Sequence, residues 1–205
     1  MKIIVKELGI KAKSPLAMVL LLSLNTLFAN SIEPDLVIQR YQEKSLLMYL
    51  SFPQERDFKI TLKDADRVLL WKENQLAAKH FSKKINLVNL PDGTYFLEIE
   101  DPQMITSCQI SIKDNHLMVE EQKRTKRYKP VITQKEEKVV LNMFSPTPTD
   151  VEITILDREQ HSVYQEVFKG EQRIERSFDF SKAPGGSYTF QTNVDGRLFT
   201  QRIDL

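Results

Sequence analysis

A turn-and-strand motif occurs twice in the 205-residue chain, at positions 93 residues apart. The first copy runs from Leu90 to Asp101 with the sequence LPDGTYFLEIED, and the second runs from Ala183 to Thr192 with the sequence APGGSYTFQT. Proline presets φ and glycine accepts positive φ, so each copy begins with a tight turn. Apolar and polar residues then alternate, which predicts a strand with one buried face.

Each motif also places a tyrosine directly after the turn, at Tyr95 and Tyr188. A tyrosine at such a corner can bury its ring while its hydroxyl group bonds to nearby backbone. We therefore assign a structural role to the turn and corner residues of both copies. They are Pro91, Asp92, Gly93 and Tyr95 in the first copy, and Pro184, Gly185, Gly186 and Tyr188 in the second.

Short alternating segments fill the rest of both halves in the same order. In the first half we expect about seven strands, at 36–41, 46–52, 58–62, 68–72 and 85–87, then the Tyr95 strand and 105–112. The polar stretch 73–82 is expected to hold a helical turn or a loose crossover. In the second half, 138–144 matches 44–50, 151–155 matches 58–62, and 203–205 matches 110–112. This strand count and spacing predict an all-β protein of two tandem Ig-like antiparallel β-sandwiches.

The first 29 residues have the composition of a signal peptide. Four lysines precede an apolar run over 16–27, and a small residue, Ala29, marks the expected cleavage point. The run is too short and too polar at its end to span a bilayer comfortably, although an uncleaved anchor is the alternative. We expect the mature chain to have no transmembrane segment.

The predicted organisation is a signal peptide over 1–29, a first sandwich over 30–114, and a second over 130–205. Residues 115–129 between them are polar and basic, and we interpret them as a solvated linker. The alternative for this basic run is a binding patch for an acidic partner. The segment contains no glycine, so it is not a floppy tether.

Net charge and cysteine content restrict the possible functions. Removing residues 1–29 removes four lysines and one glutamate, which leaves 25 basic and 27 acidic groups and a net charge of −2. Net charge therefore gives no reason to expect binding to nucleic acid. The only cysteine, Cys108, cannot form an intrachain disulfide, so stability must come from core burial. We expect Cys108 to act as a small buried hydrophobe.

The run from Leu90 to Ile99, followed by a closing strand over 108–112, resembles the small Ig-like modules of exported Bacteroidota proteins. Fibronectin type III domains carry a similar corner. The second copy is also distantly similar to the C-terminal sorting domains of type IX secretion cargo, with Ala183, Gly186 and Tyr188 at the matching positions. The similarity covers the last third of each repeat, and it implies a β-sandwich fold and an envelope location.

No arrangement of residues in the sequence predicts catalysis, a cofactor or a metal site. The three histidines lie far apart on polar stretches, and turn formation explains the aspartates of the loops. Glu98 and Glu100 alternate with apolar residues, so we interpret them as a solvated strand face. Trp71 and Phe81 are the one possible ligand platform, although packing between the sheets is the alternative.

These observations predict a non-enzymatic exported protein that acts as a protein-interaction or structural module, with another envelope or secreted protein as its partner. The expected location is the periplasm, the outer-membrane surface or the extracellular space. Two alternatives stay open: a secretion- or sorting-associated module, and a carbohydrate-binding module.

Overall fold

The computed structural model describes residues 4–6 and 33–205. This part of the chain contains β-strands and no helix, so the all-β prediction is confirmed. It forms two compact units that divide between Arg127 and Tyr128. We call residues 33–127 the first domain and residues 128–205 the second domain. The predicted signal peptide lies outside the described residues, apart from the short strand β1 (Ile4–Lys6).

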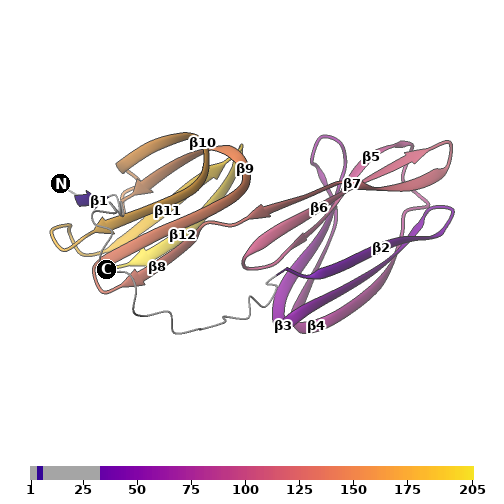
Figure 1. The fold of residues 1–205 in the computed structure, drawn as a ribbon, viewed down its shortest axis with the longest axis horizontal. Coiled ribbons are helices and arrows are strands. Elements are labelled where there is room, and N and C mark those ends of the chain that lie inside the picture. Colours follow the sequence, from indigo (N-terminus) through magenta and orange to yellow (C-terminus); the bar gives the residue numbers. More distant parts are fainter. Residues whose placement is uncertain (1–3, 7–32) are drawn as a thin grey trace, which may run out of the picture. The chain divides into compact units, whose positions relative to one another are not determined.

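The first domain is built on two long bent strands, β3 (Ser45–Lys63) and β4 (Leu69–Asn86) (Figure 1). Each of them contributes to both layers of the domain. Residues 45–51 of β3 pair with β2 and with 80–86 of β4, whereas residues 59–63 of β3 pair with β5. Register shifts between residues 51 and 58 of β3 mark the bend between the layers. The strands are β2 (Asp35–Gln42), β3 (Ser45–Lys63), β4 (Leu69–Asn86), β5 (Gly93–Glu100), β6 (Met104–Lys113) and β7 (His116–Tyr128).

The second domain repeats this plan. Residues 138–142 of β9 pair with β8, residues 151–156 pair with β11, and β10 runs beside both halves of β9. Strand β1 adds to β10 at residues 177–179. The strands are β8 (Val131–Lys135), β9 (Lys138–Leu156), β10 (Ser162–Asp179), β11 (Ser187–Val194) and β12 (Arg197–Asp204). This strand order is that of an Ig-like or fibronectin III-like sandwich.

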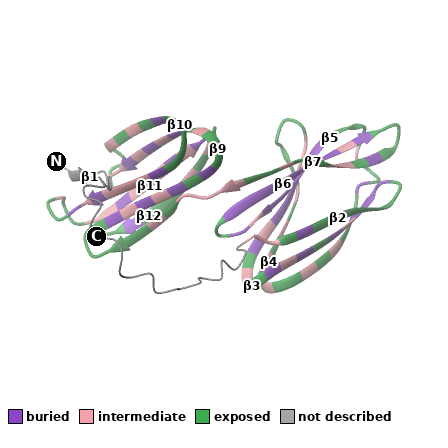
Figure 2. Cartoon of the chain, viewed as in Figure 1, coloured by how far each residue is buried: buried purple, intermediate pink, exposed green. Residues whose placement is uncertain are grey.

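Each domain has its own hydrophobic core, because alternate residues of its strands point between the two layers (Figure 2). Ile60 and Leu97 are fully buried in the first domain, and Ile153 and Phe190 are fully buried in the second. Cys108 is buried as predicted, with 1 % of its surface exposed. Burial raises the pKa of its thiol, although the nearby Arg124 acts in the opposite direction.

The two domains match more regularly than the sequence comparison indicated. Leu46 pairs with Ile85, and Val139 pairs with Phe178, so both strands of this hairpin repeat after 93 residues. The match of 44–50 to 138–144 is therefore wrong by one residue. A one-residue slip would turn every apolar side chain of the strand toward solvent, and the structure avoids this.

Two segments differ from the sequence-based expectation. Residues 73–82 lie within strand β4 rather than a helical turn or crossover, because β3 pairs with β4 along almost all of its length. Residues 116–128 form strand β7 of the first domain's sheet where a solvated linker was expected. The basic run is bound to this domain, since Arg124 donates to the carbonyl oxygen of Leu36 at 3.1 Å and Lys126 pairs with Glu33.

We expect fragments 33–127 and 128–205 each to fold alone, because each contains a complete core. A first-domain fragment that ends at residue 114 should be less stable by about 1.5–3 kcal/mol or more, because it loses the buried side chain of Leu117. Chemical denaturation of the three fragments measures this difference. Equal stability of the fragments ending at 114 and 127 would show that β7 contributes nothing to the first domain.

Candidate functional site

The predicted turn and corner residues build the same structural device in both domains. The buried Tyr95 donates its hydroxyl hydrogen to the carbonyl oxygen of Pro91 at 2.8 Å, and Tyr188 donates to that of Pro184 at 2.8 Å. Burial is the main cause that raises the pKa of both tyrosines, so both hydroxyls stay protonated as donors. Asp92 anchors the same corner, because its carboxylate accepts from the backbone N–H of Asp114 at 2.6 Å.

The glycines of these two turns differ in backbone conformation. Gly186 has a φ of 144°, which an L side chain rarely adopts. Gly93 does not have positive φ, contrary to the expectation from the sequence. The ring of Tyr95 lies over it, with the hydroxyl oxygen 3.6 Å from the position that a Cβ atom would occupy.

Trp71 and Phe81 do not form a shared ligand platform. Both rings are half-buried against the first domain's core, and Phe81 meets Phe58 edge-on with ring centroids 5.4 Å apart. Trp71 pairs in register with Leu62, whereas Phe81 pairs with Leu50, so the two rings lie on opposite sides of the bend. The structure favours the packing role that the sequence left open.

Trp71 belongs instead to a cluster that occurs in both domains. Lys83 lies over the Trp71 ring, 5.2 Å from its centroid, and forms an ion pair with Glu73. Tyr164, Glu166 and Arg176 occupy the same three positions 93 residues later. Comparing the two halves of the sequence position by position could have found this cluster.

The carboxylate of Glu166 is held ionised in this cluster. Burial acts to raise its pKa, but hydrogen bonds from Arg176 and Tyr164 outweigh burial and lower it. The Nε atom of Arg176 lies 3.2 Å from this carboxylate.

Glu98 is buried, with 4 % of its surface exposed, so its prediction as part of a solvated face is wrong. Its carboxylate lies 2.7 Å from the Nζ atom of Lys63 and 3.4 Å from Arg67. The guanidinium of Arg67 also covers the ring of Phe96, 3.6 Å from the ring centroid. A carboxylate satisfied by two cations is a structural ion pair rather than a general base.

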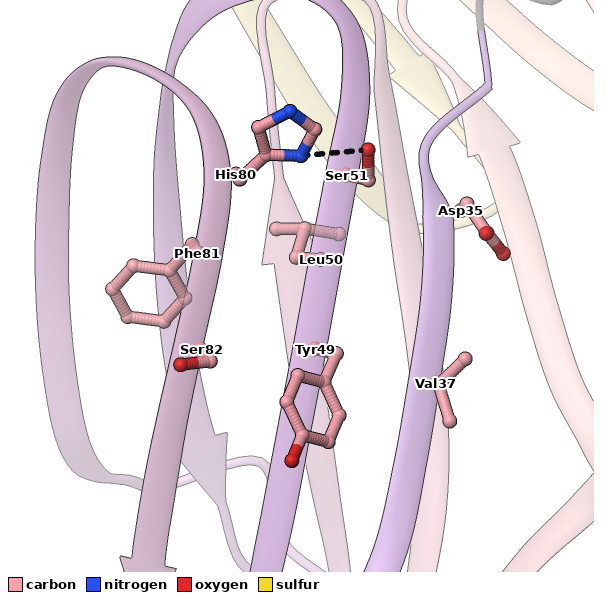
Figure 3. A pocket seen from close by; sticks show the side chains of 8 residues that line it. All are labelled: Asp35, Val37, Tyr49, Leu50, Ser51, His80, Phe81 and Ser82. Carbon is pink, nitrogen blue, oxygen red and sulfur yellow. Dashed lines mark hydrogen bonds between the residues drawn. The ribbon is translucent and has the colours of Figure 1, made fainter.

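A shallow hollow lies on the outer face of β2, β3 and β4, with a volume of 330 Å³ (Figure 3). Asp35, Ser51 and His80 are neighbours across the three strands and form one row. Val37, Tyr49 and Ser82 form the next row. The hydroxyl oxygen of Ser51 and the Nδ1 atom of His80 are 3.0 Å apart.

Exposed apolar residues occur in two segments of the first domain, around Leu70 and between Leu87 and Leu90, and both segments contribute to the lining of one cavity. Val68 and Val88 each have 57 % of their surface exposed, Leu69 has 52 %, and Leu70 has 42 %. A cavity of 240 Å³ adjoins Leu70 and is also lined by Leu62, Trp71, Leu87 and Leu90. We call Val68, Leu69, Leu70 and Val88 the apolar cluster.

The second domain shows that the fold does not require the apolar cluster. At the equivalent positions it carries His161, Ser162, Val163 and Ser181. Three of the four apolar side chains are thus replaced by polar ones on the same backbone plan. Exposed apolar groups that the fold does not need are typical of an interaction surface.

No metal-binding group is found in the part of the chain that the structure describes. Within residues 4–6 and 33–205, no group of three or more His, Cys, Asp or Glu side chains could hold a metal ion. All three histidines are exposed, as the sequence indicated. The same residues contain no helix long and apolar enough to cross a membrane.

No protein-family model matches this sequence, and no curated protein matches it. Solved structures give matches at low sequence identity. A two-domain fibronectin type III segment of chicken tenascin is 10% identical, with 84% of this chain and 99% of that chain covered and a TM-score of 0.31. The BSP domain of a biofilm-associated protein is 14% identical, with 84% of this chain and 29% of that chain covered and a TM-score of 0.28.

An α-2-macroglobulin segment from Escherichia coli that spans domains NIE-MG1 is 10% identical. The match covers 86% of this chain and 99% of that chain, with a TM-score of 0.25. The strand order described above, rather than these similarities, is our basis for the domain type.

Proposed function

We propose that this protein is a non-enzymatic module of a bacterial envelope that binds another envelope or secreted protein through the apolar cluster of its first domain. The observation that carries this proposal is the contrast between the two domains. Val68, Leu69 and Val88 are exposed and apolar, and the second domain has polar residues at all three positions. Burying these side chains against a partner would remove apolar surface from water.

Export rests on separate support. The composition of residues 1–29 is that of a secretory signal peptide, and the turn-and-strand motif resembles modules of exported Bacteroidota proteins. The protein then acts outside the cytoplasm, as a soluble or surface-attached chain. Fractionation of the native cells with an antibody to the second domain tests this location, and recovery of the uncleaved chain from the cytoplasm would contradict it.

Photo-crosslinking in the native cells tests the interaction surface. A photoreactive amino acid at Leu69 should yield one discrete adduct. The same group at Leu76 should not, because Leu76 lies elsewhere on β4 although 77 % of its surface is exposed. Val68→His and Val88→Ser introduce the residues that the second domain carries, so the fold should tolerate them.

The adduct at Leu69 should be lost in the double variant Val68→His, Val88→Ser. Equal adducts at Leu69 and Leu76 would show non-specific exposure and contradict the proposal. An adduct that survives the double variant would show that Val68 and Val88 do not contribute to binding, which would also contradict the proposal.

A further inference from the structure

The hollow on the outer face of β2, β3 and β4 is a separate feature from the apolar cluster (Figure 3). Its rows are fixed by strand register: Asp35 lies opposite Ser51, which lies opposite His80, and Val37 lies opposite Tyr49, which lies opposite Ser82. Neighbouring strands are about 4.8 Å apart, and residues two apart along a strand are separated by about 7 Å. The two rows therefore outline a patch about the size of one sugar ring with its hydroxyl groups.

The hollow combines an exposed aromatic ring with polar groups that have no partner. Tyr49 has 46 % of its surface exposed and lies beside Val37, which has 39 % exposed. Within the part of the chain that the structure describes, the Asp35 carboxylate, the Tyr49 and Ser82 hydroxyls and the His80 Nε2 atom have no hydrogen-bond partner. Solvent-facing donors and acceptors thus surround a small apolar surface.

The second domain again provides an internal comparison. Asn142, Phe144, Arg173 and Glu175 occupy the positions equivalent to Tyr49, Ser51, His80 and Ser82. In that domain Arg173 and Glu175 neutralise each other at 3.4 Å. The second domain also exposes a ring here, because 53 % of the surface of Phe144 is exposed, but the charged groups beside it are paired. The combination of an exposed ring with unpaired polar groups is therefore specific to the first domain.

We propose that this hollow, lined by Tyr49, Ser51, His80, Asp35 and Ser82, binds a neutral sugar ring. The C–H groups of one sugar face carry partial positive charge and suit the electron-rich face of Tyr49. The sugar hydroxyls can both donate and accept, which matches the mixture of carboxylate, hydroxyl and imidazole around the ring.

The size and polarity of the hollow favour this ligand over a protein. Its volume of 330 Å³ is at the lower end of the range of about 300–1,000 Å³ for small-molecule sites. The centre of a protein interface is depleted of charged residues, whereas the charged Asp35 is one of the residues that line this hollow. This inference is independent of the apolar cluster, and either can fail alone.

NMR titration of the whole chain with neutral sugars tests the site. The probes are glucose, galactose, mannose, N-acetylglucosamine and their β-1,4-linked disaccharides. At least one should shift the amide signals of Tyr49, Ser51, His80 and Ser82 in a saturable way, with no shift at the equivalent positions of the second domain. Failure of every probe to shift these signals would overturn the proposal.

Variants show whether the shifts arise from the proposed contacts. Tyr49→Asn introduces the residue of the second domain and should weaken binding about tenfold by removing the stacking surface. His80→Ala should weaken it about fivefold through one lost hydrogen bond. Asn142→Ala, at the position equivalent to Tyr49, is the control and should change nothing.

Retention of full affinity in Tyr49→Asn would overturn the site, provided that the variant melts at the wild-type temperature. Changes of amide signals that are confined to Val68, Leu69, Leu70 and Val88 would also overturn the site, because they would place the sugar on the apolar cluster. If the protein partner captured at Leu69 also shifts the amide signals of Tyr49 and His80, the hollow belongs to a protein interface and the sugar proposal is overturned.

Discussion

Replacing Tyr95 with alanine is expected to destabilise the first domain by about 3–5 kcal/mol, the usual cost of truncating a buried aromatic side chain. The ring is 5 % exposed and packs in the first domain's core, and its hydroxyl group holds the Pro91 carbonyl at the corner. The second domain should keep its stability, because its core shares no residue with the first. In thermal or chemical denaturation of the whole variant chain, the first domain should therefore unfold in a separate transition, before the second domain.

Two further variants identify the origin of this loss. Tyr95→Phe removes only the hydroxyl and should cost about 0.5–1.5 kcal/mol, the net value of one hydrogen bond. Tyr188→Ala is the matched variant of the second domain, and it should lower the other transition. A loss below about 1 kcal/mol for Tyr95→Ala would show that the ring is not a core residue.

The parts of the fold that alternate in sequence were predictable, and the parts held by distant contacts were not. Phe58 to Leu62 and the Tyr95 strand follow the alternation of a half-buried strand, and both were expected as strands. Strand β7 carries a long polar run, so alternation gives little signal there. It is held by pairing with β6 and by the buried side chain of Leu117, and Arg124 also bonds to Leu36, 88 residues away in sequence.

The candidate surfaces also differ in how far they can be predicted from the sequence. The hollow joins Asp35, Ser51 and His80 from three strands, and only the strand register brings them into one row. A ligand platform needs exposed aromatic rings, which Trp71 and Phe81 could supply, but residue type alone does not reveal the direction in which a ring points. The apolar cluster could have been found by comparing 68–70 with 161–163 at the 93-residue offset.

Deleting residues 198–205 is expected to unfold the second domain. Strand β12 pairs with β11 along its whole length, and Ile203 has only 5 % of its surface exposed. The backbone of Leu205 exchanges two hydrogen bonds with Gly186, at 2.9 and 3.0 Å. A domain of this size has only about 4–12 kcal/mol of stability, and the deletion removes both this ladder and the cover of Tyr188 and Phe190.

We therefore expect the shortened chain to aggregate or to be cut by proteases within the second domain, while the first domain stays folded. Limited proteolysis followed by mass spectrometry measures this, with the exposed substitution Arg202→Thr as the control that keeps the strand. The sorting alternative predicts a different outcome, in which the shortened chain is soluble and folded but reaches the wrong compartment. Because Gln201 also bonds to the carbonyl oxygen of Ile132 in β8, at 3.3 Å, β12 is tied to two neighbouring strands and should not behave as a detachable tail.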